Sequence, residues 1–468
     1  MPAKTEWSFI KIGKILLCIV KKGGIVLLLI GNGLLITRDP VRPVLYNGCV
    51  AARESRIAEI GTTGELRKKY PEAKYVDAKG GLIMPGLINT HMHFYSSFAR
   101  GMNLKADSPR QFNEILEKLW WRLDKTLTLD DVYFSAAVAL LDCIKNGATT
   151  IFDHHASPGC IAGSLFRISE AAQKMGIRTC LCYEVSDRDG KDVAQQGIDE
   201  NAEYIKSCAK AADPMRRALF GLHASFTLND ELLARCASTA AELDSGCHIH
   251  TAEAISDAQD CRKKHGKSVV ERLRDFGVLG EKTIASHCVH VDEREMNLLC
   301  SSRSFVVHNP ESNMGNAVGC SPVLEMMAKG VRVGLGTDGY TCDMLESLKV
   351  ANLLHKHQRQ DAGVAWGEPH MMLFEQNADF ASACFGETLG RLVPGALADV
   401  IVVDYDPPTP LTAENINGHL LFGISGRSVV TTVVHGRILM LDRKILAADE
   451  HEVMARAREK AQALWHRF

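Results

Sequence analysis

Short apolar runs alternate with longer amphipathic segments through the middle of the chain. The runs have the length of buried strands, and the segments between them have the apolar spacing of helices. The pattern predicts eight strands, at residues 85–93, 149–155, 177–185, 218–225, 245–250, 283–290, 304–309 and 331–338. Eight such units over about 310 residues favour an α/β fold, a (β/α)8 TIM barrel, over an open doubly wound sheet, and no GxGxxG motif opens any of the helices.

The two ends of the chain share a different pattern. Short β-type runs separated by Asn-Gly and other glycine-containing turns fill residues 26–84 and return after residue 394, before a charged helix closes the chain. We therefore expect a barrel domain at 85–393. Beside it we expect a small β-sandwich domain that residues 26–84 and 394–468 build together, including the C-terminal helix.

The first 25 residues fit neither domain. Residues 8–30 are apolar enough to suggest a signal peptide or a membrane anchor, but lysines interrupt every run before it reaches the roughly 18–20 residues that a span needs. No small-residue cleavage site follows. Residues 1–25 are therefore expected to be a flexible extension, or a non-native one read in frame upstream of a start at Val26.

Composition narrows the choice of partners. The chain has 468 residues, 46% of them hydrophobic, and a formal net charge of −2, which is typical of a globular protein and excludes collagen-like, disordered and multi-spanning membrane classes. Because the sequence has no basic cluster, a small molecule is favoured as the binding partner over nucleic acid or a membrane. A homodimer is one possible assembly. Fifteen cysteines without CxxC pairs indicate a reducing cytoplasm rather than a disulfide framework.

Histidines gather where the predicted strands end. Eleven of the eighteen histidines fall between His91 and His308. Because the carboxyl ends of barrel strands meet on one face, where active sites are built, side chains from distant parts of the sequence should converge there. The strand-end residues concerned are His93, His155, His223, His250, His287, His308 and Asp338.

Two His-x-His pairs suggest a metal centre. His91 and His93 lie two apart on a strand, so both imidazoles point the same way, and His248 and His250 repeat the spacing. Imidazoles and the Asp338 carboxylate are ligands for Zn or Fe, and three or four of them leave room for a water that becomes hydroxide near neutral pH. An isolated pair is a weak signal, because a strand-end histidine is more often a hydrogen-bonded loop residue. Because the candidates lie at the carboxyl ends of predicted barrel strands, metal binding is nevertheless favoured for all of them except His248. We call this expectation the strand-end rule.

Several longer motifs resemble one known family. They are PGLINTHMH, GATTIFDHHASP, GLHASFTL, HTAE at 250–253, SHCVH at 286–290, HNPESNMGNAVG and GTDG at 336–339. Over about Leu27 to Lys444 the chain resembles the amidohydrolase superfamily, in the mononuclear branch of adenosine-analogue, guanine and cytosine deaminases and triazine chlorohydrolases. It is most similar to the SsnA group of aminohydrolases. The resemblance implies a metal-bearing barrel beside a β-sandwich.

The resemblance also implies roles for the strand-end residues. Glu253 matches the acid that shuttles protons between water and substrate, and because it follows His250 by three residues it must lie on the loop past the strand. His287 matches the histidine that hydrogen-bonds the metal water. By the alternation of a strand we favour His287 over His290 at the barrel mouth. Asp338 would both bind the metal and take the water proton; the implied metal ligands are His91, His93, His250 and Asp338.

The metal count and the substrate contacts follow from other positions. Two-metal members carry a bridging lysine or glutamate at the end of the fourth strand, where this chain has His223, so one divalent ion (Zn or Fe) is expected and His223 is assigned to the substrate. Arg100 would bind a carboxylate or ring carbonyl, or make a surface ion pair. Asn309, Asn313 and Asn316 would present their amides to a heterocycle, with Asn313 the one assigned to the substrate, or the segment would only shape a turn. Trp120 and Trp121 are expected in the core.

The predicted function is that of a metal-dependent aminohydrolase. A metal-activated hydroxide would attack an sp2 carbon of a nitrogen heterocycle or amidine, with release of ammonia, so the enzyme class is hydrolysis of carbon–nitrogen bonds other than peptide bonds. Two alternatives remain open: a hydrolase that opens a cyclic amide or removes chlorine with the same site, and a catalytically inactive scaffold barrel. The filled ligand and proton-transfer positions disfavour the scaffold.

Overall fold

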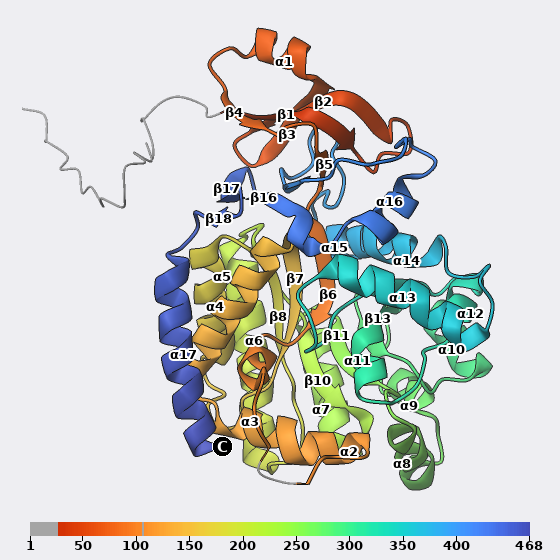
Figure 1. Cartoon of the computed structure of the whole chain (residues 1–468). Helices are drawn as coiled ribbons and strands as arrows, with labels where there is room; N and C mark the ends of the chain where they lie inside the picture. Colours follow the sequence, from red (N-terminus) through yellow and green to blue (C-terminus); the bar gives the residue numbers. More distant parts are fainter. Residues whose placement is uncertain (1–26, 105–106) are drawn as a thin grey trace, which may run out of the picture.

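The computed structural model describes residues 27–104 and 107–468, so the interpretation of residues 1–25 concerns a segment outside the described residues. Within them the chain forms a (β/α)8 barrel, and a largely antiparallel sheet from both chain ends lies beyond one end of the barrel (Figure 1). The α/β fold class expected from the sequence is therefore confirmed.

Eight parallel strand positions close the barrel. Their strands are β6 (Leu87–Met92), β7 (Ala148–His155), β8 (Arg178–Tyr183), β9 (Arg216–Ala218) with β10 (Phe220–Ala224), β11 (Cys247–Thr251), β12 (Ile284–His287), β13 (Phe305–His308) and β14 (Arg332–Leu335). The fourth position is split: β9 pairs with β8, and β10 pairs with β11. Two isolated parallel bridges complete the ring, Val185 with Leu222 and Met92 with Asp338.

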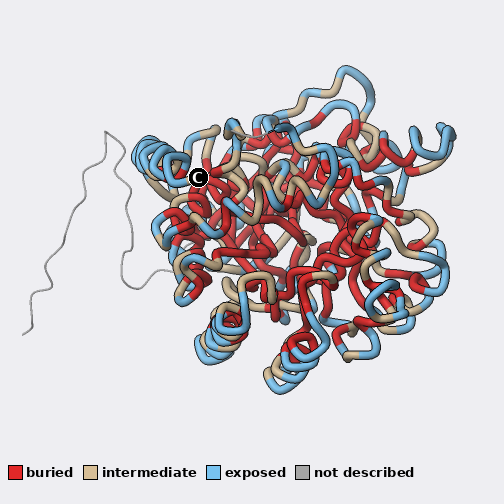
Figure 2. Tube along the Cα trace, turned by 90° about the horizontal axis from the view of Figure 1, so that it is seen from below, coloured by how far each residue is buried: buried red, intermediate tan, exposed pale blue. Residues whose placement is uncertain are grey.

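Helices surround this ring and fill its connections. The described helices and helical turns are η1 (Phe94–Ala99), α2 (Phe112–Ile115), η2 (Leu116–Trp120), α3 (Trp121–Thr126), α4 (Leu129–Lys145), α5 (Ser164–Met175), α6 (Lys191–Ala211), η3 (Ser225–Thr227), α7 (Asp230–Glu242), α8 (Ile255–His265), α9 (Val269–Asp275), α10 (Glu293–Ser301), α11 (Pro310–Gly315), α12 (Val323–Ala328), α13 (Met344–Arg359), α14 (Glu368–His370), η4 (Met371–Gln376) and α15 (Asn377–Phe385). Buried residues fill the middle of the molecule, and exposed residues cover the outer faces of the helices (Figure 2).

Local sequence signals set the helix ends. At the start of α4 the Thr128 hydroxyl accepts a hydrogen bond from the Asp131 amide, and the Asp131 carboxylate accepts one from the Thr128 amide at 2.8 Å. This capping box satisfies two amides that the first turn leaves free. At the other end of the next helix, α5, Gly176 takes φ of 80°, a left-handed conformation that glycine adopts without strain. The capping box fixes where α4 begins, and the glycine lets α5 stop just before the next barrel strand.

Both chain ends build the second sheet. Its strands are β1 (Leu27–Ile36), β2 (Val44–Arg53), β3 (Arg56–Thr62), β4 (Lys74–Asp77), β5 (Leu82–Pro85), β15 (Val400–Val403), β16 (Val429–Val434), β17 (Arg437–Leu441) and β18 (Lys444–Ile445), with helix α1 (Thr63–Lys69) beside them and α16 (Ile416–Gly423) and η5 (Gly426–Ser428) between β15 and β16. The antiparallel pairing of β5 with β15 joins the amino-terminal strands to the carboxyl-terminal ones. The expected sandwich is thus one continuous nine-stranded sheet.

The C-terminal helix α17 (Glu450–Arg467) packs on the barrel helix α4 rather than on the second sheet (Figure 1). The Trp465 indole N–H donates a hydrogen bond to the carbonyl of Phe98 at 2.8 Å, and Lys460 forms an ion pair with Asp130 at 2.8 Å. The helix therefore holds the first βα unit of the barrel from outside. Among the helices of the described residues, none has the length and apolar character needed to cross a membrane.

Candidate active site

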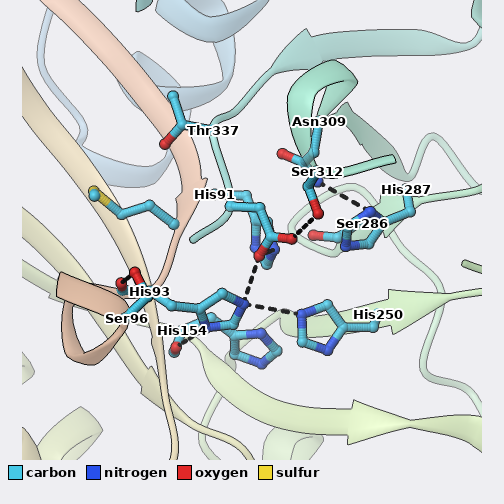
Figure 3. Close-up of polar contacts among 12 residues, drawn as sticks. His91, His93, Ser96, His154, His250, Ser286, His287, Asn309, Ser312 and Thr337 are labelled. Carbon is cyan, nitrogen blue, oxygen red and sulfur yellow. Dashed lines mark hydrogen bonds and ion pairs between the residues drawn. The ribbon is translucent and has the colours of Figure 1, made fainter. Parts of the chain in front are cut away.

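The strand-end histidines converge at the carboxyl end of the barrel. His91 comes from β6, His93 follows that strand directly, and His250 comes from β11; in Figure 3 their rings lie together. His93 Nε2 lies 2.8 Å from Asp338 Oδ1, and His91 Nε2 lies 3.4 Å from the same oxygen. His250 Nε2 is 3.3 Å from His93 Nε2. The structure thus brings together all four side chains predicted as metal ligands.

The histidines of this cluster are arranged as metal-binding histidines are. His91 Nδ1 lies 2.8 Å from His248 Nε2, and His250 Nδ1 lies 3.1 Å from the carbonyl oxygen of His223. In both rings the nitrogen that points away from the centre is therefore held by a neighbour, which fixes the orientation of the ring. The inner nitrogen of His91 is buried and has no hydrogen-bond partner among the described residues. A buried polar atom without a partner is unfavourable, and a metal ion would satisfy it. The residues present therefore fit a divalent metal.

The geometry provides for one ion. Three groups of described side chains have ligand atoms within 4.8 Å of one another: His91, His93, His154 and His250; His91, His250, His287 and Asp338; and Glu184, His223 and His250. All three groups use His250, whose Nδ1 already contacts the His223 carbonyl oxygen. The remaining ring nitrogen binds one ion, so the groups are alternatives around a single centre.

Backbone contacts fix Asp338 against the strand that carries the His-x-His pair. The amides of Thr337 and Asp338 both donate to the His91 carbonyl at 3.0 Å, and Asp338 takes φ of 52°, which is uncommon outside glycine. Gly336 makes this approach possible, because a Cβ there would lie 2.9 Å from the same carbonyl and 2.5 Å from Asn309 Oδ1. The Ser312 hydroxyl donates a short hydrogen bond to Asp338 Oδ2.

The charged side chains at the proposed metal centre shift one another's pKa values. Burial alone would raise the pKa of Asp338, but His93 and His91 outweigh it and hold that pKa well below its usual range. Burial opposes protonation of His93, yet Asp338 and Glu184 raise its pKa to about 10. Burial lowers the pKa of His91 to about 3. The Asp338 carboxylate and the His93 imidazole thus favour each other's charged forms, so this site favours a positive charge beside Asp338.

Two further predicted residues face this centre. Glu253 lies on the loop after β11, where its spacing from His250 requires it, and its Oε2 is 3.6 Å from His287 Nε2. Burial raises the pKa of Glu253 to about 7, so the carboxyl can both take and give a proton near neutral pH. His287 ends β12, and its Nδ1 contacts Asn313 Oδ1 at 2.9 Å. His290 instead turns to the carbonyl of Val318, at 2.8 Å.

A pocket opens onto the metal centre. Its polar lining includes His93, Asp124, Glu184, His223, His250, Glu253, Asn316 and Asp338, and its apolar lining includes Tyr95, Phe112, Leu116, Trp120, Trp121, Phe226 and Tyr340. Trp120 and Trp121 were expected in the core; Trp120 does pack against the main hydrophobic cluster, and both side chains also line the pocket. An aromatic pocket with convergent polar groups is suited to a flat heterocycle.

The three residues predicted to contact the substrate lie in different surroundings. His223 lines the pocket, but Asn313 lies behind His287, and Asn316 takes the place at the pocket wall, with its amide 3.4 Å from Glu253 Oε1. Arg100 lines a neighbouring cavity, its side chain is 64% exposed, and it pairs with Asp142 at 3.1 Å, which is the surface alternative considered for it. This cavity adjoins the pocket and shares His93 and Asp338 with it, so Arg100 lines the adjoining cavity but not the pocket itself.

The strand-end rule missed one residue because it was applied only to histidine and aspartate. Glu184 directly follows β8, lines the pocket and is buried, with 4% of its side chain exposed. Applied to all carboxylates, the same rule would have found it. Asp124, which pairs with Arg188 in the same wall, comes from a helical segment, and no spacing rule indicated it.

A (β/α)8 barrel with one histidine-rich metal centre and a buried acid beside it defines the class of metal-dependent hydrolases. Comparison with known proteins gives the family. The model of the amidohydrolase family matches residues 82–439, and the chain belongs to this family. A shorter match, at residues 48–73, is to the imidazolonepropionase-like composite domain of bacteria.

Similar proteins agree with this assignment. The chain is 31% identical over 441 residues to a 5'-deoxyadenosine deaminase of Methanosarcina mazei, covering 93% of this chain and 98% of the relative. It is 31% identical over 449 residues to a 5-methylthioadenosine/S-adenosylhomocysteine deaminase of Pelotomaculum thermopropionicum, covering 94% and 99%. A zinc-bound adenosine deaminase structure from Xanthomonas campestris has the same fold, with a TM-score of 0.83, 22% identity and coverage of 93% and 98%. The chain is a metal-dependent aminohydrolase acting on carbon–nitrogen bonds.

Proposed function

We propose that this chain deaminates a 6-aminopurine nucleoside or a closely similar aminated heterocycle, with release of ammonia. The observation that supports this most directly is the buried Glu253 carboxyl, which faces His287 beside the metal ligands and opens onto an aromatic pocket. The names of the relatives indicate the substrate class, because the relatives cover nearly the whole chain.

The proposed site assigns a task to each residue, and Asp338 has two. His91, His93, His250 and Asp338 would hold one Zn or Fe ion, which when bound lowers the pKa of a coordinated water toward neutrality. Glu253 takes a proton at its carboxyl oxygen and passes it to a ring nitrogen of the substrate, which activates the neighbouring carbon for attack. His287 orients the attacking water through Nε2, because its Nδ1 is fixed on Asn313. Asp338 would accept the second proton of that water and pass it to the leaving amino group, which departs as ammonia.

Stacking would hold the substrate. Trp120, Trp121 and Phe226 all line the pocket, and the rings of Trp121 and Phe226 lie 6.3 and 5.8 Å from the His223 ring. Flat faces of this kind bind a heterocycle with little loss of conformational freedom and exclude water from the reacting carbon.

Asn313 does not contact the substrate in this proposal. It acts through His287, whose Nδ1 it contacts, so its role is that of a positioning residue.

Ammonia release tests the proposal. Zinc-loaded protein is assayed with 5'-deoxyadenosine, 5-methylthioadenosine, adenosine, guanine and an aminated triazine, and chloride release is followed with a chlorinated triazine. We expect the purine nucleosides to give the highest kcat/KM, and Glu253→Gln, with metal content unchanged, to lower kcat at least about 100-fold. Chloride release or ring opening without ammonia would overturn the proposal. Inactivity of both proteins on the whole panel would favour the scaffold.

We also propose that the protein works on small molecules in the cytoplasm, as a homodimer if it associates. All fourteen cysteines of the described residues are free thiols, which is typical of a reducing compartment. The near-neutral charge supports a small heterocyclic partner over nucleic acid.

A further inference from the structure

Asn316 is a buried amide in the pocket wall to which the proposed reaction assigns no task. It directly follows α11, and only 8% of the residue is exposed. Its Nδ2 donates to the Ser312 hydroxyl oxygen at 3.1 Å and to Glu253 Oε1 at 3.4 Å, which uses both hydrogens of the amide nitrogen. Because Ser312 gives its own hydrogen to Asp338, its oxygen accepts from Asn316, and the amide nitrogen must lie on this side.

Tyr340 holds the other end of this amide. Its hydroxyl donates to Asn316 Oδ1 at 3.2 Å, from the loop that follows β14. Gly315 leaves room for this contact, because a Cβ there would overlap the hydroxyl and the ring of Tyr340. Side chains from three elements therefore fix the plane of the Asn316 amide, with its nitrogen turned toward Glu253.

The contact with Asn316 makes the two oxygens of Glu253 unequal. Oε1 accepts the hydrogen bond from Asn316, whereas Oε2 lies 3.6 Å from His287 Nε2. His287 belongs to one of the groups of side chains around the proposed metal centre. An amide N–H donates to the carboxyl oxygen that carries no hydrogen, so a proton on Glu253 belongs on Oε2. The oxygen that faces the centre is thus the one free to exchange protons.

We propose that Asn316, itself held by Tyr340, is a positioning residue that holds Glu253 by Oε1, so that Oε2 takes the proton of the attacking water and passes it to the ring nitrogen. The proposal rests on the function proposed above and names the oxygen and the supporting side chains that this step needs. Misplacement of a reacting group by about 1 Å costs roughly 100-fold in rate. Loss of the Asn316 contact should therefore lower kcat, with little effect on substrate binding.

Steady-state kinetics of zinc-loaded variants tests the positioning. The assay uses the compound that wild type turns over fastest and follows ammonia or chloride, since Glu253 serves either leaving group. Asn316→Leu keeps a side chain of similar size without a donor, so kcat should fall about 10–100-fold while KM stays within about twofold of wild type. Tyr340→Phe keeps the ring in the pocket wall and removes only the hydroxyl, so kcat should fall less, about 3–10-fold.

The same substitutions in a Glu253→Gln background separate positioning from a general structural role. With no carboxyl left to position, Asn316→Leu and Tyr340→Phe should change the residual kcat by less than about twofold. Tyr70→Phe is the matched control, because it removes a tyrosine hydroxyl that donates to Glu59 at 2.8 Å in the second domain. It should leave kcat unchanged in both backgrounds. The zinc content of every variant is measured alongside.

A wild-type kcat in Asn316→Leu would overturn the proposal. So would falls of the same size in both backgrounds, or falls that follow the zinc content alone, because Asn316 would then act on the fold or the metal rather than on Glu253. Wild-type protein that turns over nothing would refute the proposed function instead. Crystal structures of zinc-loaded wild type and Asn316→Leu then decide the positioning: the Glu253 carboxyl should rotate in the variant, and an unchanged carboxyl would refute it.

Discussion

The Ser312 side chain holds one oxygen of the Asp338 carboxylate in place. Its hydroxyl donates to Asp338 Oδ2 and accepts a hydrogen bond from the Asn316 amide at 3.1 Å. Partners of this kind orient a metal-binding carboxylate, and their loss typically weakens metal binding about 10–100-fold. We therefore expect Ser312→Ala to bind zinc about 10–100-fold more weakly than wild type, measured by competition with a chromophoric chelator.

A matched serine provides the control. Ser97 donates to the carbonyl of Ser135 at 2.9 Å and touches none of the proposed ligands, so Ser97→Ala should bind zinc as wild type does. If both alanine variants released zinc at the same chelator concentration, the hydrogen bond to Asp338 would not be the cause.

Single residues could be predicted from the sequence where their spacing along a strand determines which way their side chains point. The direction of the His-x-His pair at the end of β6 and the position of Glu253 follow from strand alternation and from the convergence of strand ends. Ser312 could not be found in this way, because it lies on the short helix α11 and reaches the centre only through the path of the loop. Asp338 and His287 adopt left-handed φ values of 52° and 73°, which no apolar pattern encodes.

At the scale of elements, helices α11 and α13 meet through a buried carboxyl. Glu311, in the first turn of α11, accepts hydrogen bonds from the Ser347 hydroxyl of α13 at 2.9 and 3.0 Å. Burial raises the pKa of Glu311 to about 7. Its protonated form therefore stabilises the fold fully below the ordinary glutamate pKa of about 4.3, and that stability is lost as the pH rises through about 7.

Glu311→Gln tests this dependence, since the amide stays neutral. Relative to wild type, its free energy of unfolding should be nearly unchanged at pH 5 and higher by roughly 1–3 kcal/mol at pH 9. Urea unfolding of zinc-saturated protein at the two pH values measures the difference. A gap of the same size at pH 5 and pH 9 would contradict a buried, titrating Glu311.

The strands themselves were well predicted, since each of the eight apolar runs contains or overlaps a barrel strand. Burial on both faces makes such strands continuous apolar runs, which end abruptly at polar residues. The split of the fourth strand at Leu219 was not foreseen, because the predicted run at 218–225 contains β10 but only the last residue of β9, which begins with two arginines.

Across the whole molecule, pairing of the two chain ends was predictable from their shared β pattern, whereas the position of α17 was not. An amphipathic pattern shows which face of a helix is apolar but not which neighbour covers it. In the structure Ala457 and Leu464 are buried, and the helix lies along α4 with Trp465 bonded to the Phe98 carbonyl of η1. Because η1 begins directly after His93, the C-terminus is mechanically linked to the metal-binding strand.

Removal of residues 449–468 should therefore loosen the first βα unit before the rest of the barrel. We expect the free energy of unfolding to fall by roughly 2–5 kcal/mol, as buried apolar contacts are lost. Amide exchange should increase in η1 and α4 but remain as in wild type in β12 and β13, which lie elsewhere in the ring. Leu464→Ala, which keeps the helix, should show a smaller change of the same pattern. Exchange that rises evenly over all barrel strands would contradict a local link, and unchanged exchange in η1 would show that the Trp465 contact does not hold the segment beside His93.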